Sequence, residues 1–551
     1  MKTSSATARE KGTDLLKVRD LHVEGFSDER WHPIVRGVDL SLKRGEVLGL
    51  IGESGAGKST IGLAAMGYAK PGCRITQGSV LFDGVDLLSM SEARRRRLRG
   101  SRIAYVAQSA AAWFNPAHRL LDQTVETAVA HGIASRDKAN RDAIELYRRL
   151  QLPEPETIGF RYPHQVSGGQ LQRAMTAMAM ACRPDLIVFD EPTTALDVTT
   201  QVEVLVSIRR IVEDFNTAAI YVTHDLAVVA QMADRIMVLR HGQTVEEADT
   251  RQMLTAPTQE YTRTLWAVRK LAKPEIKTQD YLLTIDNVTA AYAGRVKVLA
   301  DVSIKVPRGR TVAVVGESGS GKSTLARVVT GLLPAISGSL SFDAKPLPLS
   351  LKERSKDLLR RIQMIYQSPD SALNPRQTVE DIIARPLEFY LGLKGEQRDR
   401  RVGELMHMIE MDESFLDRLP GELSGGQKQR ICIARALAAN PELIICDEVT
   451  SALDQIVQEE ILTLLMRLQR ELGISYIFIT HDIATVRAIA DEVVVMHQGK
   501  VVEQGLKTEI LTPPHAAYTE LLLSSVPDMD PDWLTQLLAR RKNQGILDPA
   551  G

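Results

Sequence analysis

The chain has few cysteines and no long apolar run. Its 4 cysteines, Cys73, Cys182, Cys432 and Cys446, form no Cys-x-x-Cys pair. This spacing argues against a zinc site and a disulfide framework, and we expect small core side chains in a reducing compartment. No uninterrupted apolar stretch approaches the ~18 residues that a membrane-spanning helix needs, so we predict that the chain does not cross a bilayer.

An excess of charge of one sign is also lacking. Lys and Arg number 68 and Asp and Glu number 69, so the charge balance gives no reason to expect nucleic acid as a partner. Residues 1–14 are polar and lack the apolar region of a signal peptide, which argues against secretion. A length of 551 residues predicts several domains.

A glycine-rich loop, Gly-Glu-Ser-Gly-(Ala/Ser)-Gly-Lys-Ser-Thr, occurs twice. Each copy follows a short apolar run and precedes a helix-prone stretch, which is the strand, loop and helix context of a P-loop. A glycine-rich turn that binds nothing is the alternative, and two copies in matching context argue against it. The expected phosphate-binding residues are Gly52, Ser54, Gly55, Gly57, Lys58, Ser59 and Thr60, and Gly316, Ser318, Gly319, Gly321, Lys322, Ser323 and Thr324.

The residue types in this loop suit a nucleotide triphosphate. Glycines let backbone N–H groups converge on phosphate oxygens, and the start of the following helix favours an anion. Lys58 and Lys322 are expected to reach the β- and γ-phosphates, and Ser59 and Ser323 to ligate Mg²⁺.

The two loops belong to a long internal repeat. Lys58 and Lys322 are 264 positions apart, and each later pair is 257 positions apart. These later pairs are Ser167 and Ser424, Asp190 and Asp447, His224 and His481, and Tyr261 and Tyr518. A repeat of about 250 residues predicts two homologous domains in tandem.

The domain boundaries follow from this repeat. We predict a polar tail over residues 1–14, nucleotide-binding domains over 15–266 and 281–524, a linker over 267–280 and a tail over 525–551. Within the last tail, residues 533–538 (Trp-Leu-Thr-Gln-Leu-Leu) favour a short amphipathic helix. We expect this helix to dock on its own domain.

Each repeat alternates strands and helices, which predicts the α/β class. Strand-rich segments come first, at 16–20 and 34–42 and at 282–288 and 298–306, and polar helix-rich insertions follow at 109–165 and 368–422. Continuous apolar runs at 186–189 and 443–446 predict parallel strands that are buried on both faces, and further strands are expected at 219–222 and 476–479.

An acidic pair follows each buried apolar run, Asp190-Glu191 and Asp447-Glu448. Ligand sites of parallel sheets lie at such strand ends. The aspartate is expected to hold Mg²⁺, often through water, and the glutamate to polarise an attacking water. Taken alone, the pair is equally consistent with a solvated turn. Beside a P-loop in the same repeat it forms a Walker B motif.

Both repeats resemble ATP-binding-cassette ATPases, and six motifs occur in the family's order in each. Ser167-Gly168-Gly169-Gln170 and Ser424-Gly425-Gly426-Gln427 are similar to the family's signature motif. Gln108 and Gln367 match its Q-loop, and Glu191 to Asp197 and Glu448 to Asp454 match the passage from Walker B to the D-loop. His224 and His481, each in Thr-His-Asp, match its switch histidine.

This resemblance implies an architecture and a mechanism. Each domain is expected to have a RecA-like parallel-sheet core, an antiparallel β subdomain and a helical subdomain. The two domains would pair head-to-tail, so that the P-loop of one acts with the signature motif of the other on two ATP molecules. The implied catalytic residues are Glu191, Glu448, His224 and His481, and the implied Mg²⁺ ligands are Ser59, Gln108, Asp190, Ser323, Gln367 and Asp447. Because no motif is degenerate, we expect both sites to hydrolyse ATP.

The family also places an aromatic ring before the P-loop to stack on adenine. Tyr292 fits this role in the second repeat, and Phe26, with Trp31 as the alternative, is the candidate in the first. Phe26 lies 32 positions before Lys58, whereas Tyr292 lies 30 before Lys322, so the two registers differ. A core aromatic residue is the other interpretation.

Subfamily features resemble the oligopeptide, dipeptide and nickel import branch. Each repeat closes with Pro-x-x-x-Tyr-Thr-x-x-Leu, at 257–265 and 514–522, and each Q-loop is followed by an Asn-Pro pair. The resemblance implies two transmembrane permease subunits and a solute-binding protein as partners, and a peripheral location on the cytoplasmic face of the inner membrane. Some members carry an iron–sulfur cluster, but neither repeat has cysteines after the cassette, so we expect no iron–sulfur cluster and no zinc.

Two functions stay open at this point. The first is the energy-coupling ATPase of an importer, whose cargo (peptide, glutathione, opine-type metallophore, nickel complex or peptide antibiotic) the sequence does not specify. The alternative is a tandem cassette ATPase that acts on ribosomes or DNA. Ribosome-acting members usually have a long charged linker and DNA-repair members have zinc cysteines, and both features are missing here.

Overall fold

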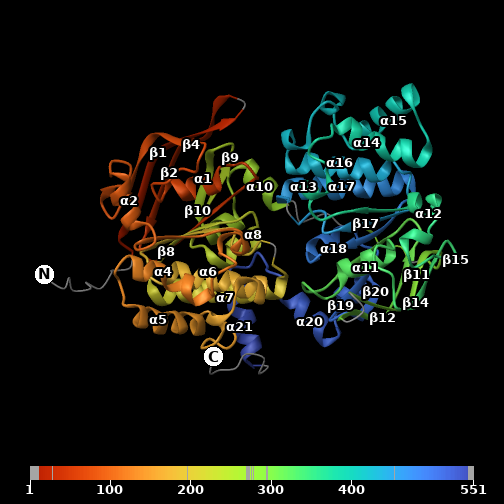
Figure 1. The fold of residues 1–551 in the computed structure, drawn as a ribbon. Helices are drawn as coiled ribbons and strands as arrows, with labels where there is room; N and C mark the ends of the chain where they lie inside the picture. Colours follow the sequence, from red (N-terminus) through yellow and green to blue (C-terminus); the bar gives the residue numbers. More distant parts are fainter. Residues whose placement is uncertain are drawn as a thin grey trace. The chain divides into compact units, whose positions relative to one another are not determined.

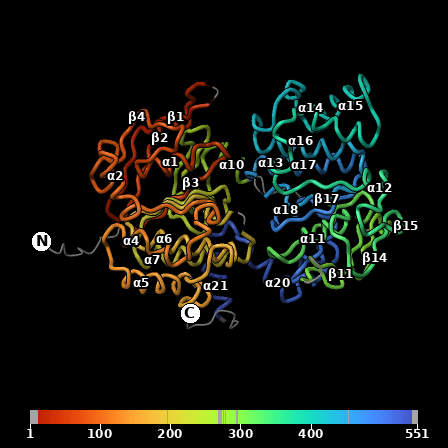
Figure 2. The backbone as a smooth tube through the Cα atoms, viewed as in Figure 1, coloured from red at the N-terminus to blue at the C-terminus, as the bar shows by residue number. Residues whose placement is uncertain are grey.

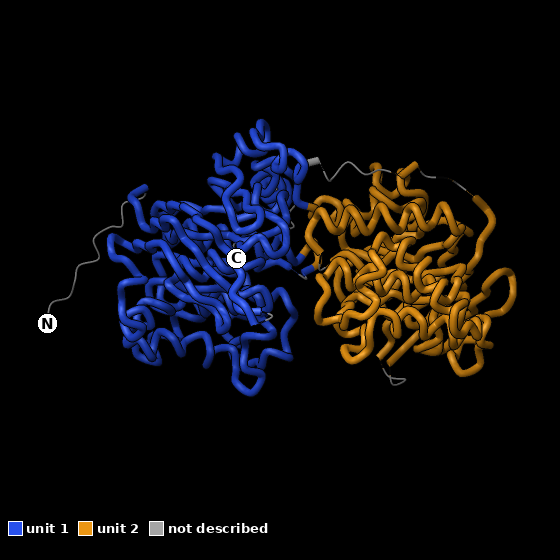
Figure 3. Tube along the Cα trace, turned by 90° about the horizontal axis from the view of Figure 1, so that it is seen from above, with its two compact units in different colours: residues 1–196, 200–267, 527–551 blue, residues 197–199, 268–526 orange. Residues whose placement is uncertain are grey.

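The computed structural model describes residues 12–27, 29–194, 196–267, 273–274, 276, 278–292, 296–451 and 453–543. Residues 1–11 of the predicted N-terminal tail, part of the predicted linker and residues 544–551 lie outside this description. The chain forms two compact units, shown in different colours in Figure 3. Unit 1 comprises residues 1–196, 200–267 and 527–551, and unit 2 comprises residues 197–199 and 268–526.

Unit 1 is built on a six-stranded sheet with the order β10-β9-β3-β8-β7-β6. Figure 1 labels β8, β9 and β10 of this sheet. Only β10 runs antiparallel to its neighbour. Every residue of β3, β7 and β8 is buried, as expected for parallel strands covered on both faces. The strands are β3 (Val47–Gly52), β6 (Ile103–Val106), β7 (Leu186–Asp190), β8 (Ala218–Val222), β9 (Arg235–Arg240) and β10 (Gln243–Asp249).

An antiparallel sheet with the order β2-β1-β4-β5 accompanies this core. Its strands are β1 (Asp14–Ser27), β2 (Arg30–Lys43), β4 (Cys73–Phe82) and β5 (Val85–Asp86).

The helices of unit 1 are α1 (Lys58–Ala64), α2 (Glu92–Leu98), α3 (Ala110–Trp113), α4 (Leu120–Ala130), α5 (Arg136–Arg149), α6 (Gly168–Met180), α7 (Val198–Phe215), α8 (Leu226–Met232), α9 (Thr250–Thr255), α10 (Glu260–Ala267) and α21 (Trp533–Asn543).

Unit 2 repeats this architecture. Its sheets have the orders β16-β17-β18-β13-β19-β20 and β12-β11-β14-β15. The strands are β11 (Tyr281–Tyr292), β12 (Val296–Pro307), β13 (Thr311–Val315), β14 (Ser337–Phe342), β15 (Lys345–Pro346), β16 (Ile362–Ile365), β17 (Leu443–Asp447), β18 (Ser475–Ile479), β19 (Glu492–His497) and β20 (Lys500–Leu506). The helices are α11 (Lys322–Val329), α12 (Lys356–Arg361), α13 (Pro369–Ala372), α14 (Val379–Pro386), α15 (Gly395–Met408), α16 (Gly425–Leu437), α17 (Gln455–Leu472), α18 (Ile483–Ile489), α19 (Lys507–Leu511) and α20 (Ala517–Ser524).

These elements confirm the predicted α/β class with parallel and antiparallel sheets. The predicted strands at 186–189 and 443–446 are β7 and β17, and helices α3–α5 and α13–α15 lie in the two insertions. Cys432 and Cys446 are buried core residues, whereas Cys73 and Cys182 are only half-buried. Within the described ranges, no helix is both long enough and apolar enough to cross a membrane.

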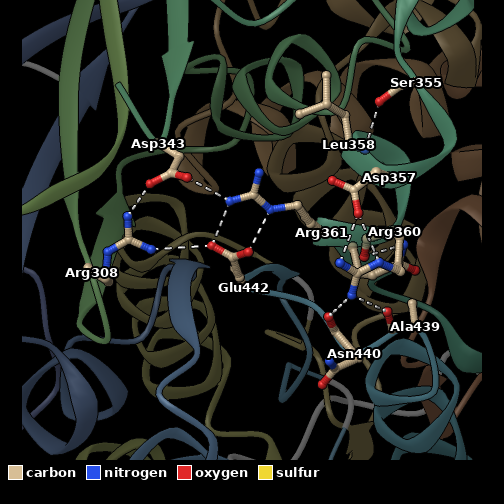
Figure 4. Close-up of polar contacts among 11 residues, drawn as sticks. Arg308, Asp343, Ser355, Asp357, Leu358, Arg360, Arg361, Ala439, Asn440 and Glu442 are labelled. Atoms are coloured by element: carbon tan, nitrogen blue, oxygen red, sulfur yellow. Dashed lines mark hydrogen bonds and ion pairs between the residues drawn. The ribbon is translucent and has the colours of Figure 1, made fainter. Parts of the chain in front are cut away.

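Four charged side chains join the antiparallel sheet of unit 2 to its core (Figure 4). Arg308 Nη2 lies 2.5 Å from Asp343 Oδ1, and Arg361 Nη2 lies 3.0 Å from Asp343 Oδ2. The same two guanidinium groups contact Glu442, at 3.3 and 2.6 Å. Asp343 follows β14 and Glu442 precedes β17, so the network ties the two sheets together at the ends of the core strands opposite the acidic pair.

Unit 1 contains the same network. Arg44 and Arg102 both contact Asp83, at 2.7 Å each, and both contact Asp185, at 3.0 and 2.6 Å. The Asp185 side chain is only 1% exposed, whereas that of Glu442 is 36% exposed. The repeat therefore extends to a structural ion-pair network, which is more deeply buried in unit 1.

The C-terminal helix α21 packs on unit 1, and Figure 2 shows it beside α7. Leu534 and Leu537 are buried in a core cluster of unit 1 that includes Val204 and Ile208. Gln231 of α8 donates from Nε2 to the carbonyls of Asp528 and Asp530, at 2.8 Å each, and accepts from Leu534 N at 3.0 Å.

The tail follows the second domain in the chain, but α21 packs on unit 1. The expectation that this tail docks on its own domain is therefore wrong. The amphipathic pattern of α21 shows that one face will be covered, but it contains no information on which unit covers it. Gln231 is one residue that differs between the two candidate surfaces, since the corresponding position in unit 2 is Ala488.

Candidate functional site

The glycine loop of unit 1 connects the end of β3 to the start of α1. A Cβ on Gly52 would lie 2.1 Å from the Leu239 carbonyl oxygen, so only glycine fits there. Gly57 caps α1 with a left-handed φ of 91°. Lys58 is buried, and its Nζ donates to the carbonyls of Gly52 and Glu53 at 2.7 and 2.9 Å. The loop is thus closed around the ammonium group.

Unit 2 reproduces this loop. A Cβ on Gly316 would lie 2.1 Å from the Met496 carbonyl oxygen. Lys322 Nζ donates to the carbonyls of Gly316 and Glu317 at 2.7 Å each. Burial lowers the pKa of Lys322 from its ordinary value, although Glu448 and other nearby carboxylates oppose this effect.

The aspartate of each acidic pair lies against the serine of the P-loop. Ser59 Oγ donates to Asp190 Oδ1 at 2.7 Å, and Ser323 Oγ donates to Asp447 Oδ1 at 3.1 Å. Burial raises the pKa of Asp447 above its ordinary value, while the Ser323 hydrogen bond opposes the rise. Each pair offers a carboxylate and a hydroxyl, which are the hard oxygen ligands that Mg²⁺ prefers.

The glutamate of the first acidic pair is held by its neighbours. Gln108 Nε2 donates to Glu191 Oε2 at 2.8 Å, Thr194 Oγ1 donates to the same oxygen at 3.1 Å, and His224 Nδ1 lies 3.1 Å from Oε1. The backbone of Glu191 has a φ of 49°, which is uncommon outside glycine and typical of strained functional positions.

The second glutamate has a similar environment, except that Ser451 donates to its main-chain carbonyl instead of its carboxylate. Glu448 has a φ of 50°, Gln367 Nε2 donates to its Oε2 at 2.7 Å, and His481 Nδ1 lies 3.6 Å from its Oε1. The P-loop, Q-loop, acidic pair and histidine predicted from the sequence thus converge within each unit.

In each unit, the glutamate and the neighbouring histidine shift each other's pKa. Burial opposes the ionisation of Glu191, but the hydrogen bond and positive charge of His224, together with Lys58 and Thr194, outweigh it and lower the Glu191 pKa. Burial likewise opposes the protonation of His224, but Glu191 outweighs it and raises the His224 pKa. Glu448 and His481 show the same two directions. Both glutamates are therefore held as carboxylates near neutral pH.

The predicted signature residues begin helices α6 and α16. Ser167 Oγ accepts from Gln170 N at 3.3 Å, and Gln170 Oε1 accepts from Ser167 N at 3.1 Å. Ser424 and Gln427 form the same capping box, at 3.3 and 2.9 Å. The serine and the first glycine after it are exposed in both units, so each helix begins at an exposed N-terminus, where an anion is favoured.

Tyr292 lies close to the P-loop helix of its unit. Its hydroxyl is 3.4 Å from Thr324 Oγ1 and accepts from Arg327 Nη1 at 3.1 Å, while 37% of the residue stays exposed. Phe26 packs instead against Trp31, with ring centroids 5.2 Å apart. Both residues stay predictions as adenine platforms, with Tyr292 the better placed.

Two contacts were not predicted from the sequence. The Tyr105 hydroxyl donates to Asp190 Oδ2 at 2.6 Å, and burial together with this carboxylate raises the pKa of Tyr105. The Tyr518 hydroxyl accepts from Glu317 N, in the second P-loop, at 3.0 Å. The first joins residues 85 positions apart, on the adjacent strands β6 and β7. The second joins segments 201 positions apart and left no local pattern.

The chain matches two family profiles and is similar to known proteins over most of its length. The ABC transporter family profile matches residues 35–194 and 299–451, and the profile of the oligopeptide/dipeptide transporter C-terminal region matches residues 502–549. The glutathione import ATP-binding protein GsiA of Salmonella choleraesuis is 36% identical over 562 residues, covering 94% of this chain and 90% of that protein. GsiA of Escherichia coli O157:H7 has the same identity and coverage. Among solved structures, cbiO1 from Clostridium perfringens, part of the ABC transporter complex cbiONQ, is 33% identical, with 42% of this chain and 91% of that chain covered and a TM-score of 0.39.

Proposed function

Since this chain belongs to the ABC transporter family of ATPases, we propose that it powers the import of peptides or related small molecules across the inner membrane. The observation that carries this proposal is the combination of two complete cassettes with an oligopeptide/dipeptide transporter C-terminal region. The similarity to glutathione import ATP-binding proteins over nearly the whole chain supports a peptide-type cargo.

Within each unit, the side chains have separable roles. Lys58 and Lys322 bind the β- and γ-phosphates in place of the loop carbonyls that they contact here. Ser59 and Asp190, and Ser323 and Asp447, would hold Mg²⁺. Gln108 and Gln367, which donate to Glu191 and Glu448 here, would complete each set of ligands. When bound, Mg²⁺ neutralises charge on the phosphate oxygens.

The two glutamates act on the water that attacks the γ-phosphate. Glu191 and Glu448 are ionised near neutral pH, so each orients this water and accepts its proton. His224 and His481 would contact the γ-phosphate, and each lies beside the carboxylate of its own unit, at 3.1 and 3.6 Å.

We infer two composite sites, in which the P-loop of one unit acts with the signature motif of the other. The exposed helix starts at Ser167 and Ser424 support this inference, because the backbone N–H groups at the start of a helix favour a γ-phosphate. The test is Ser424→Arg in the Lys322→Ala background, where only the P-loop of unit 1 binds phosphate. Loss of the remaining turnover supports the head-to-tail arrangement, and unchanged turnover contradicts it.

The proposed partners are two transmembrane permease subunits and a solute-binding protein, with this chain peripheral on the cytoplasmic face of the inner membrane. The similarity to import ATP-binding proteins supports these partners. No nucleic acid is expected.

Affinity purification of the full chain from detergent-solubilised membranes, followed by mass spectrometry, tests the assignment to import. Two polytopic permeases in the purified complex support it and lead to the cargo. Ribosomal or DNA-repair proteins without permeases would overturn the import role while leaving the ATPase assignment in place.

A further inference from the structure

The two magnesium sites proposed above differ in one hydrogen bond. In unit 1, Asp190 accepts at both carboxylate oxygens, from Ser59 Oγ at 2.7 Å and from the Tyr105 hydroxyl at 2.6 Å. Asp190 is buried at the end of β7, and Tyr105 reaches it from the adjacent strand β6. The short distance is typical of a hydroxyl that donates to an ionised carboxylate.

Unit 2 has no hydroxyl at the equivalent place. Tyr105 pairs with Val188 in the β6–β7 register, and Met364 pairs with Ile445 in the β16–β17 register. Val188 and Ile445 are 257 positions apart, the spacing of the repeat, so Met364 occupies the position of Tyr105. A thioether cannot donate a hydrogen bond, so Asp447 receives nothing from this residue.

The Tyr105 ring is fixed from more than one side. The residue is half-buried, its ring packs against core clusters of unit 1, and the Trp113 ring centroid lies 5.9 Å away. A donor held in this way restricts rotation of the carboxylate that it contacts. In metal sites, such partners orient the ligand, and their removal weakens metal affinity by typically 10- to 100-fold.

We propose that Tyr105 is a positioning residue that orients the Asp190 carboxylate, so that the ATP site of unit 1 binds its divalent cation more tightly than the site of unit 2. This inference rests on the proposed function, because it assumes that Asp190 and Asp447 serve the cation of each nucleotide. It adds that the two complete sites are unequal in their cation dependence.

The test measures Mn²⁺ binding by electron paramagnetic resonance on the full chain with a non-hydrolysable ATP analogue. Lys322→Ala removes the phosphate contact of unit 2, so that the remaining cation–nucleotide complex reports on unit 1. In this background, Tyr105→Phe removes only the hydroxyl, and Tyr105→Met installs the residue that unit 2 carries. Met364→Leu is the matched control in unit 2.

We expect Tyr105→Phe and Tyr105→Met to weaken Mn²⁺ binding roughly 10-fold, and Met364→Leu to leave it unchanged. Affinity for the analogue in EDTA should stay within about 2-fold, because the described hydrogen bond of the hydroxyl goes to Asp190 and not to the P-loop. Unchanged Mn²⁺ affinity with one bound analogue per chain would overturn the role of Tyr105 but leave the ATP site intact. An equal loss with and without Mn²⁺ would also overturn it, since that result indicates a general packing defect. If the unmodified chain binds no Mn²⁺ with the analogue, the proposed function itself fails.

Discussion

His224 Nδ1 lies 3.1 Å from Glu191 Oε1, and this pair joins the switch histidine of unit 1 to its acidic motif. The equivalent atoms of His481 and Glu448 are 3.6 Å apart. Since each partner shifts the pKa of the other, the contact has consequences for stability that depend on pH.

The first prediction concerns that pH dependence. The pKa of Glu191 is lowered from 4.5, so its contribution to stability is full above pH 4.5 and is lost as pH falls through the lowered value. The pKa of His224 is raised from 6.5, so its contribution is full below pH 6.5 and is lost as pH rises through the raised value. The pair is therefore most stabilising between these two ordinary values.

Melting curves of the unmodified chain and of His224→Ala test this window. We expect the difference in Tm between them to be larger near about pH 5.5 than near about pH 9. His481→Ala should show the same trend with a smaller amplitude, because the second pair is farther apart. A difference that grows toward alkaline pH would contradict the account.

The second prediction concerns the ion-pair networks that join the two sheets of each unit. Asp185→Asn leaves the two arginines without their buried carboxylate, and we expect a loss of about 3–5 kcal/mol in the free energy of unfolding. Glu442→Gln changes the matched position in unit 2, where the side chain is 36% exposed, and should cost at most about 1 kcal/mol. Calorimetric unfolding of the two variants measures both losses of free energy. Equal losses would show that the deeper burial of Asp185 does not make its network more stabilising than that of Glu442.

The third prediction concerns the C-terminal helix. Gln231→Ala removes three hydrogen bonds to the segment before and at the start of α21. We expect faster amide hydrogen exchange over residues 527–543, because the segment keeps the burial of Leu534 and Leu537 but loses these three hydrogen bonds. Arg540→Ala, at an exposed position of the same helix, is the control and should leave exchange unchanged. Unaltered exchange in Gln231→Ala would show that the hydrogen bonds do not anchor the tail.

The fourth prediction concerns Tyr518, which belongs to the Pro-x-x-x-Tyr-Thr-x-x-Leu element. Tyr518→Phe removes the acceptor of the Glu317 N–H, and an unmade hydrogen bond of this kind costs about 1–3 kcal/mol. In the Lys58→Ala background, we expect nucleotide affinity at unit 2 to fall by roughly 5-fold or more. Tyr68→Phe, at an exposed tyrosine, is the control. If affinity is unchanged, the tyrosine has no role in holding the P-loop.

The sequence predicted most of the fold because the informative patterns are local. Apolar runs of strand length defined β7 and β17, and the P-loop consensus located Gly52 to Thr60 between a strand and a helix. The repeat contains each motif twice, so each assignment was supported by a second copy. The residues around Glu191 and Glu448 were predicted as a set for the same reason.

The contacts that escaped prediction depend on tertiary structure. Tyr105 contacts Asp190 across 85 positions, because two parallel strands lie side by side. The docking of α21 on unit 1 includes the contact of Gln231 with Leu534, which lies 303 positions later. Neither pair leaves a periodic or short-range pattern, so one sequence without an alignment contains no means of finding it.

The most direct test of the account is ATP turnover of Glu191→Gln, Glu448→Gln and the double variant, since both units hold an ionised glutamate beside a complete P-loop. Glutamine keeps the shape of the side chain but cannot accept the proton of the attacking water. We expect each single variant to fall below half of the unmodified rate, and the double variant to lose about 10²-fold or more. Full turnover in either single variant would contradict the claim that both sites hydrolyse ATP.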